Sequence, residues 1–242
     1  MATAAEAYAD AGYMLAAWNR RFGKGPRDKD WGLRAFPPDQ ITDEHNIGLN
    51  HALSRTCVLD IDDFALTQTV LEEFGLDLEE LAASTMSYRG NPERIKLVFK
   101  APDPMLGVKK LQILSADSGA AHVAFELRGA KVGGQAQDVL PPRIHPGTNK
   151  PYKFETRLMP RDELPTLPEP LLDIWACWDE WEPTLRELLG DTTVGQNPRR
   201  RSKKAVEAKG AEVTTEFNRR YECGEILERN CGFHSMPGHD ST

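Results

Sequence analysis

The stretch RTCVLDIDDFAL, residues 55–66, decides the fold because a short apolar run ends there in closely spaced carboxylates. Side chains of a β-strand alternate between its two faces. If this run is a strand, Asp60 and Asp62 share a face and lie about 7 Å apart along it, from a rise of about 3.3 Å per residue. The other face is then apolar. It carries Cys57, Leu59 and Ile61, with Val58 on the aspartate side.

Two later stretches, RIKLVF at 94–99 and VAFELR at 123–128, repeat this alternation of apolar and charged side chains. Laid side by side, the three strands predict a sheet with one apolar face and one charged face. The apolar face is expected to hold Ile95, Leu97, Phe99, Val123, Phe125 and Leu127. The charged face is expected to hold Asp60, Asp62, Arg94, Lys96, Glu126 and Arg128.

This charged face has the composition of a site for a nucleoside triphosphate. Close carboxylates repel, and one of them takes up a proton unless a cation lies between them. A divalent metal removes that conflict, and oxygen ligands with few histidines favour Mg²⁺ or Mn²⁺ over zinc. The lysine and arginines suit phosphates. The pattern indicates metal-assisted phosphoryl or nucleotidyl transfer; a sheet whose charged face is simply solvated is the alternative, and alternation alone does not decide between them.

Composition limits the class of protein. The chain has 242 residues, 40% of them apolar, and a net charge of −7, which argues against a generally basic surface but allows a local basic cleft. Four scattered cysteines suit a reducing compartment better than a disulfide framework. The N-terminus lacks the features of a signal peptide, and no apolar run approaches the roughly 20 residues of a membrane helix. A cytoplasmic protein, in a bacterium or in the host of a phage that encodes it, is expected.

The order of elements predicts an α+β domain over residues 1–190. A polar, basic linker is expected at 191–211, and a short helical tail at 212–242 whose abrupt end suggests a truncated gene or a fragment. Helices are expected at 3–21, 63–85 and 168–190, the last interrupted near Pro183 and packing its three tryptophans on the sheet. Two strands are expected within 45–63, one within 93–102, one within 122–130, and two short ones flanking a loop within 138–155.

Six segments together resemble a known family. They are GKGPRDKDW (23–31), HNIGL (45–49), CVLDIDD (57–63), SYRGNPERIKLVF (87–99), FELRG (125–129) and LPPRIHPGTNKPYKF (140–154). In this order they resemble the primase–polymerase domain at the N-terminus of bifunctional replication proteins of plasmids, phages and prophages. That domain belongs to the archaeo-eukaryotic primase superfamily. The resemblance covers most of residues 5–160.

The resemblance implies an RNA-recognition-like antiparallel sheet that carries metals, with a smaller N-terminal α/β lobe that helps to hold DNA. It implies Asp60, Asp62 and Glu126 as ligands of two divalent ions, Mg²⁺ or Mn²⁺, in a reaction that joins a nucleotide to a 3′-hydroxyl and releases pyrophosphate. Lys96, Arg128, Arg143 and His145 would contact the nucleotide, and Lys24 and Arg94 would contact DNA. The family's second motif usually has a histidine where this chain has Lys96, and its third more often has aspartate than Glu126.

The expected partners are a DNA template and primer and nucleoside triphosphates, with a replicative helicase as a further candidate; the chain itself is expected to be a monomer. Lys96 keeps a rival function open, because a lysine pairs with phosphate as a point charge but cannot act as a neutral imidazole. The rival is a degenerate, non-catalytic module that binds nucleotide or single-stranded DNA for a helicase. A nuclease or another phosphotransferase that uses the same carboxylates is a third possibility.

Overall fold

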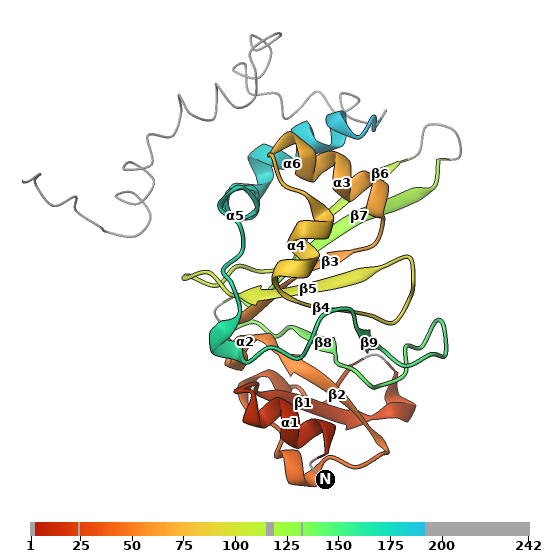
Figure 1. Ribbon diagram of the computed structural model, residues 1–242, viewed down its shortest axis with the longest axis vertical. Coiled ribbons are helices and arrows are strands. Elements are labelled where there is room, and N and C mark those ends of the chain that lie inside the picture. The colour runs from red at the N-terminus through yellow and green to blue at the C-terminus, as the bar shows by residue number, and fades with distance from the viewer. Residues whose placement is uncertain (1–2, 24, 115–118, 132, 192–242) are drawn as a thin grey trace, which may run out of the picture. The chain divides into compact units, whose positions relative to one another are not determined.

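A six-stranded antiparallel sheet, in the order β6-β7-β3-β5-β4-β9, carries most of the fold (Figure 1). The computed structural model describes residues 3–23, 25–114, 119–131 and 133–191. Lys24, the predicted tail and all of the predicted linker beyond Asp191 lie outside these residues. The six strands are β3 (Thr56–Ile61), β4 (Met86–Arg89), β5 (Ile95–Lys100), β6 (Lys109–Leu114), β7 (Ala121–Arg128) and β9 (Lys153–Phe154).

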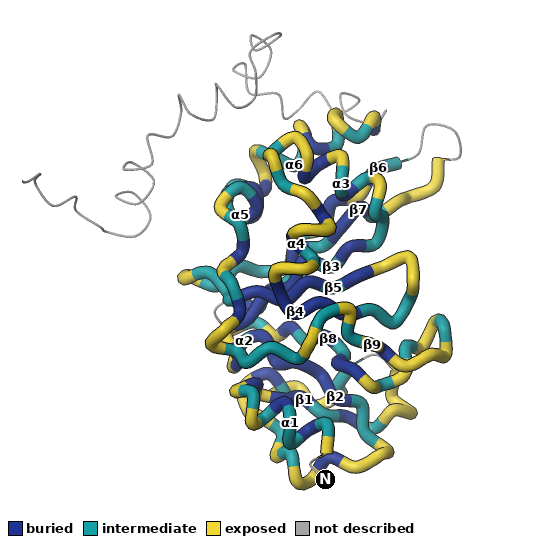
Figure 2. Tube along the Cα trace, in the orientation of Figure 1, coloured by how far each residue is buried: buried dark blue, intermediate teal, exposed yellow. Residues whose placement is uncertain are grey.

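The two faces of this sheet pack against different parts of the chain, as the alternation in 55–66 predicts. Cys57, Leu59 and Ile61 belong to a core cluster that also contains residues of four helices. Val58, on the other face, packs in a second cluster with the N-terminal segment. Figure 2 shows β3 and β5 as mostly buried. The helices of the first cluster are α3 (Phe64–Glu73), α4 (Leu78–Ser84), α5 (Glu169–Ala176) and α6 (Trp178–Leu188).

A three-stranded antiparallel sheet, in the order β1-β2-β8, forms a smaller lobe with the first helix. Its last strand comes from a distant part of the chain, so the lobe is not continuous in sequence. The elements of this lobe are α1 (Ala4–Asp10), β1 (Leu15–Asn19), β2 (His45–Asn50) and β8 (Gln137–Val139). A short helix, α2 (His51–Ser54), leads from β2 directly into β3 of the larger sheet. Short 3₁₀ helices cover Arg20–Phe22, Trp31–Leu33, Pro38–Gln40 and Arg161–Glu163.

The predicted α+β class, the antiparallel sheet and the small N-terminal lobe are confirmed. The two strands within 45–63 form, although they lie in different sheets. The strands within 93–102 and 122–130 form as expected, and β8 and β9 flank the predicted loop. Strands β1, β4 and β6 were not predicted from the sequence.

The predicted helix at 3–21 is wrong after Asp10. Helix α1 ends there, and Gly12 adopts a φ of 86°, a conformation that side-chain-bearing residues rarely take. Residues Leu15–Asn19 then pair with β2 as a strand. Their apolar side chains are spaced in a way that also fits a helix, and the long-range partner strand decides between the two.

Two further helix predictions need correction. The helix at 63–85 is divided into α3 and α4, because the chain turns at Gly75 with a φ of 67° and α4 begins afresh behind Asp77, whose side chain caps it. In the C-terminal helical segment the break lies at Cys177, whereas Pro183 lies inside α6. The packing of the tryptophans is confirmed, since Trp175 and Trp178 are buried in the core and Trp181 packs against it.

The expected place of Val123 in the core is also wrong. Ala124 and Phe125 lie in the core cluster, whereas Val123 is half-buried. The pairing of β6 with β7 shifts in register between Leu111 and Gln112, which places an extra residue in β7. Such a bulge interrupts strict alternation for the residues before it. The residues after it, including Glu126, lie on the predicted faces of the sheet.

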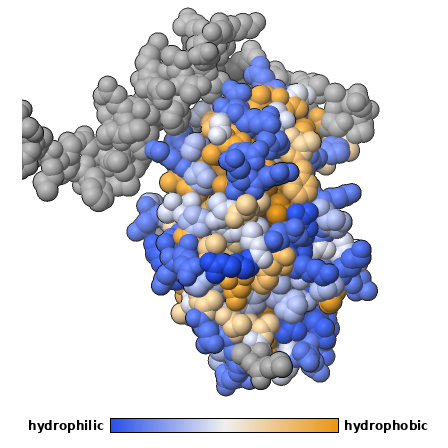
Figure 3. Space-filling model, in the orientation of Figure 1, coloured by the Kyte–Doolittle hydropathy of each residue, from blue (hydrophilic) through white to orange (hydrophobic). Residues whose placement is uncertain are grey.

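Over the described residues, the surface of the domain shows no unusual concentration of hydrophobic side chains on the face drawn in Figure 3. In Figure 3 hydrophobic side chains lie in separate patches between hydrophilic ones on the face in view, which is ordinary for a domain surface.

Asp191 is buried and its carboxylate pairs with Arg186 at 2.8 Å, so the packed structure continues at least to this residue. Within the described ranges, no helix combines the length and the apolar character needed to cross a membrane.

Candidate functional site

A polar cleft of about 530 Å³ opens where the charged face of the large sheet meets the small lobe. Its lining includes residues of β2, β3, β4, β5, β7 and β8 and of the loop that follows β8. Of the residues predicted from sequence, the cleft brings together Asp60, Asp62, Arg94, Lys96, Arg128 and His145. Glu126 and Arg143 are not among the residues that line it.

Strand register places the central charges of the site. Strand β3 lies between β5 and β7, so Asp60 is directly opposite Lys96 on one side and Glu126 on the other. Side chains at directly opposed positions of antiparallel strands lie close together on the same face. Asp60 therefore has Lys96 and Glu126 as its immediate neighbours on this face of the sheet. This convergence is the one that the three alternating segments predict.

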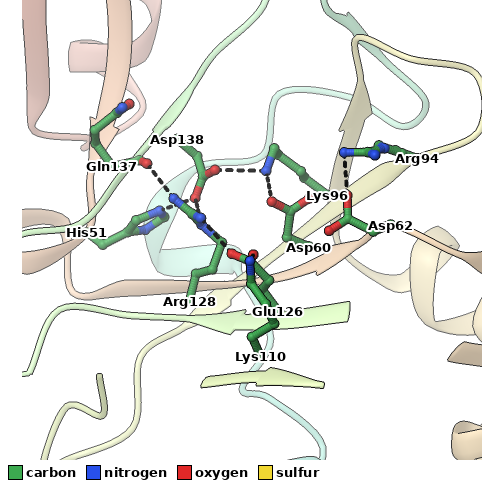
Figure 4. Close-up of polar contacts among 10 residues, drawn as sticks. All are labelled: His51, Asp60, Asp62, Arg94, Lys96, Lys110, Glu126, Arg128, Gln137 and Asp138. Atoms are coloured by element: carbon green, nitrogen blue, oxygen red, sulfur yellow. Dashed lines mark hydrogen bonds and ion pairs between the residues drawn. The ribbon is translucent and has the colours of Figure 1, made fainter. Parts of the chain in front are cut away.

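The ammonium group of Lys96 contacts two carboxylates at once (Figure 4). It forms an ion pair with Asp60, and a second one at 2.9 Å with Oδ1 of Asp138, a residue of β8 in the smaller sheet. Burial alone would lower the pKa of the Lys96 ammonium, but the carboxylates of Asp138 and Asp60 outweigh this and raise it above its usual value. Lys96 is therefore a permanent cation of the site.

Asp138 is the functional-site residue that sequence reasoning missed most clearly. Its side chain is only 4% exposed, and Oδ2 accepts from Nε2 of His51 at 2.9 Å and from Nε of Arg128 at 3.1 Å. Burial would raise the pKa of this carboxyl, but Lys96, Arg128 and His51 hold it well below its usual value. The only local signal was an aspartate in the short strand before the two prolines, which did not indicate its partners.

His51 completes the buried network behind Asp138. Its Nδ1 lies 2.9 Å from the hydroxyl of Thr56, the first residue of β3, while its Nε2 contacts Asp138. All three side chains are buried. Because the network joins α2, β3 and β8, it ties the small lobe to the large sheet directly behind the cleft. Nothing in the sequence pattern of 45–63 distinguishes His51 from an ordinary helix residue.

Asp62 lies just beyond the end of β3 and lines the cleft. Its carboxylate pairs with Nη1 of Arg94 at 2.6 Å, and its backbone N–H donates to the carbonyl of Ala124. The side chain of Arg94 is 55% exposed. The carboxylate of Asp62 is 14% exposed, so only its arginine partner is largely in solvent and can leave it at little cost. Of the three predicted carboxylates, Asp62 is thus the one whose partner cation is most exposed.

Glu126 is held by two cations on the same face of the sheet. Lys110 of β6 contacts it at 2.6 Å and Nη1 of Arg128 at 2.9 Å. Burial would raise the pKa of Glu126, but the hydrogen bonds from Lys110 and Arg128 outweigh it and lower the pKa. Arg128 also donates to the carbonyl of Gln137 at 3.1 Å, so it links Glu126 to β8. Lys110 was not identified from sequence.

The two predicted residues of the Pro-Pro loop occupy different environments. His145 lines the cleft, and its Nδ1 accepts the backbone N–H of Thr148 at 3.0 Å. In the neutral ring the proton is then on Nε2. Arg143 lies away from the cleft lining, 3.9 Å from the carboxylate of Asp43. The structure therefore brings His145, but not Arg143, to the site.

Gly90 allows the loop that carries His145 to pack tightly against the end of β4. A Cβ added to Gly90 would lie 2.7 Å from Cβ of His145 and from the ring of Tyr152. We expect Gly90→Ala to lower the free energy of unfolding by about 1–3 kcal/mol, because a well-packed site cannot take the extra methyl group without moving. Urea denaturation followed by circular dichroism measures this.

The matched control for this change is Gly107→Ala. The nearest atom to a Cβ added there is Cδ of Lys131 at 3.6 Å, an ordinary contact with a flexible side chain. This variant is expected to have nearly wild-type stability. Equal stabilities of the two alanine variants would show that the loop does not depend on the missing side chain of Gly90.

The three predicted metal ligands have the right chemistry, but they are already paired with cations. Carboxylate oxygens suit Mg²⁺ or Mn²⁺. Asp60 contacts Lys96, Asp62 contacts Arg94, and Glu126 contacts Lys110 and Arg128. In the part of the chain that the structure describes, no three acidic, histidine or cysteine side chains are grouped as metal ligands. The ligand types therefore fit a divalent ion, whereas the balance of charges does not favour two.

One comparison with known proteins identifies the family. The family model for the N-terminal domain of bifunctional DNA primase/polymerases, Prim-Pol, matches residues 5–170. This range is more than half of the chain and contains both sheets and every residue of the cleft discussed above. No curated protein sequence matches the chain at a significant level.

Proposed function

Because the chain belongs to the Prim-Pol family of bifunctional DNA primase/polymerase N-terminal domains, we propose that it is a template-directed nucleotidyltransferase. The proposed reaction is primer synthesis, DNA polymerisation or both. The observation that carries the proposal is the family match over the segment in which Asp60, Asp62 and Lys96 line a common cleft. DNA and nucleoside triphosphates are the substrates that the family implies.

The basic side chains of the cleft suit a triphosphate. Five of them line it, on several elements around the carboxylates. Guanidinium groups bind phosphate oxygens through two parallel hydrogen bonds, and an ammonium binds as a point charge. We assign the nucleotide's phosphates to this part of the cleft, with Nε2 of His145 as a further donor. The five basic residues are Arg20, Arg89, Arg94, Lys96 and Arg128.

The proposed chemistry is an in-line displacement at the α-phosphorus. The 3′-oxygen of the primer forms the new P–O bond, the bond to the β-phosphate bridging oxygen breaks, and pyrophosphate leaves. The proton of the 3′-hydroxyl must be removed as the bond forms, and the carboxylate of Asp60 or Asp62 is the candidate acceptor. Burial raises the pKa of Asp60 despite the opposing effect of Lys96, which makes its carboxylate a stronger base than that of an ordinary aspartate.

The family is generally metal-dependent, and Mg²⁺ or Mn²⁺ is the ion we propose. Asp60, Asp62 and Glu126 are the candidate ligands. When bound, such an ion stabilises negative charge on the reacting phosphate oxygens. The family resemblance implies two ions; how many this chain holds depends on the cations that already occupy its carboxylates.

Primer extension tests the proposed function. We expect the full chain, given a primed DNA template, nucleoside triphosphates and Mn²⁺ or Mg²⁺, to lengthen the primer, and a single-stranded template without a primer to show whether it also starts chains. Shortening of the primer would indicate a nuclease. Binding of nucleotide or DNA without extension, under either metal, would favour the degenerate binding module and contradict the proposal.

A further inference from the structure

The side chain of Lys96 is less exposed than those of the other cations that pair with the candidate ligands, although Arg128, at 25%, also contacts two carboxylates. The Lys96 side chain is 15% exposed and contacts Asp60 and Asp138 together (Figure 4). Arg94, the partner of Asp62, and Lys110, a partner of Glu126, are 55% and 46% exposed. Half-exposed partners swing into solvent at little cost, whereas a buried ammonium between two carboxylates does not.

Asp138 keeps the Lys96 ammonium in place from behind. It belongs to the smaller sheet, and His51 and Arg128 fix its other oxygen, so it cannot follow Lys96 out of the cleft. Moving Lys96 away from Asp60 would leave Asp138 with less positive charge in a buried position. Removing one partner of a buried ion pair is strongly destabilising because the other charge stays buried without compensation. An incoming divalent ion would have to overcome this cost to take the Lys96 position.

The carboxylates around Asp60 and the cations that pair with them are equal in number. Four carboxylates (Asp60, Asp62, Glu126 and Asp138) face four cations (Lys96, Arg94, Lys110 and Arg128), and the two sums cancel. Two divalent ions would add four positive charges to this set. One divalent ion that exchanges with the exposed Arg94 near Asp62 adds far less repulsion, because Arg94 can leave.

We propose that the Lys96 ammonium is a resident cation of the site, which occupies the metal-binding position at Asp60 so that the chain takes fewer divalent ions than its carboxylates would otherwise hold. The inference rests on the proposed function only for the identity of the ion, Mg²⁺ or Mn²⁺. It predicts that loss of the Lys96 charge creates a tighter divalent-metal site in the absence of nucleotide and DNA.

Titration of the full chain with Mn²⁺ alone, with free Mn²⁺ measured by electron paramagnetic resonance, tests this. We expect Lys96→Met to bind Mn²⁺ at least about tenfold more tightly than the wild type, which corresponds to about 1.4 kcal/mol. Lys110→Met is the matched control, because it removes the same charge from a neighbouring carboxylate at an exposed position. We expect it to change the affinity by less than about threefold, since exposed pairs contribute little. All variants keep the same C-terminal residues, so any binding there cancels in the comparison.

A second variant keeps the test decisive if Lys96→Met does not fold. Lys96→Met combined with Asp138→Asn removes one positive and one negative charge, so its net charge equals that of the wild type. Circular dichroism reports folding, and the double variant is again expected to bind Mn²⁺ at least about tenfold more tightly than the wild type. If the folded Lys96 variants bind Mn²⁺ no more tightly than Lys110→Met, the resident-cation proposal is wrong. Primer extension is not the readout, so failure of the proposed function and failure of this inference remain separate results.

Discussion

Replacing Asp60 and Asp62 together by alanine is expected to abolish primer extension while the chain stays folded. The two carboxylates are the acidic residues of the first motif that line the cleft, where the 3′-hydroxyl and the phosphates are proposed to meet. Loss of one preorganised electrostatic group typically lowers a rate by about a hundredfold to a thousandfold, and two are removed here. Lys96 retains Asp138 and the exposed Arg94 is simply released, so the fold should survive.

The matched control is Asp103→Ala with Asp162→Ala. These aspartates also pair with arginines, Arg55 and Arg161, but they are highly exposed and lie away from the cleft. Extension by this variant should equal that of the wild type in a gel assay of single-nucleotide addition. If the Asp60 and Asp62 double variant, shown to be folded by circular dichroism, still extends primers at the wild-type rate, these residues do not carry the reaction.

Asp138→Asn is expected to lower the free energy of unfolding by about 3 kcal/mol or more. The change leaves Lys96, Arg128 and the buried His51 facing a neutral amide at the buried position 138, and breaking a buried ion pair typically costs about 3–5 kcal/mol. Denaturation in guanidinium chloride at pH 7 measures the difference as a shift in midpoint. A loss below about 1 kcal/mol would show that the network is not a main link between the lobes.

The difference in the free energy of unfolding between the wild type and Asp138→Asn should become smaller in acid. The pKa of Asp138 in the folded chain is depressed well below its usual value, despite burial, by Lys96, Arg128 and His51. A depressed pKa means that the stability from this group is present above the unfolded-state pKa of about 3.9 and is lost as the pH falls below it towards the folded-state pKa. The stability gap between wild type and Asp138→Asn should therefore narrow below about pH 4.

Asp191→Asn provides the control for a buried carboxylate that has no place in the cleft. It removes a buried ion-pair partner of Arg186 and should also destabilise the chain. Nucleotide affinity separates the two variants, because Asp138 positions Lys96 and Arg128 in the cleft and Asp191 does not. Asp138→Asn should weaken nucleotide binding in an equilibrium titration, whereas Asp191→Asn should leave it unchanged.

The face of the sheet on which each charged residue lies could be predicted from the sequence, because alternation is a local property of a strand. The period of two in 57–62 and 94–99 correctly separated the apolar face from Asp60 and Lys96. It failed at Val123, where a bulge in β7 interrupts the period. Local spacing was also insufficient at 15–19, where pairing with β2 decides in favour of a strand.

The ion pairs of the site were decided by tertiary structure alone. The motifs named Asp60, Lys96 and Arg128, but nothing in them indicated that Asp138 of a second sheet would hold both cations, or that His51 would fix Asp138. Which carboxylate neutralises a buried cation depends on which distant segments the fold brings within about 3 Å, and no short-range pattern carries that information. The sequence by itself determined that Asp60, Lys96 and Arg128 lie on one face of the large sheet. The meeting of the two sheets determined how their charges are balanced.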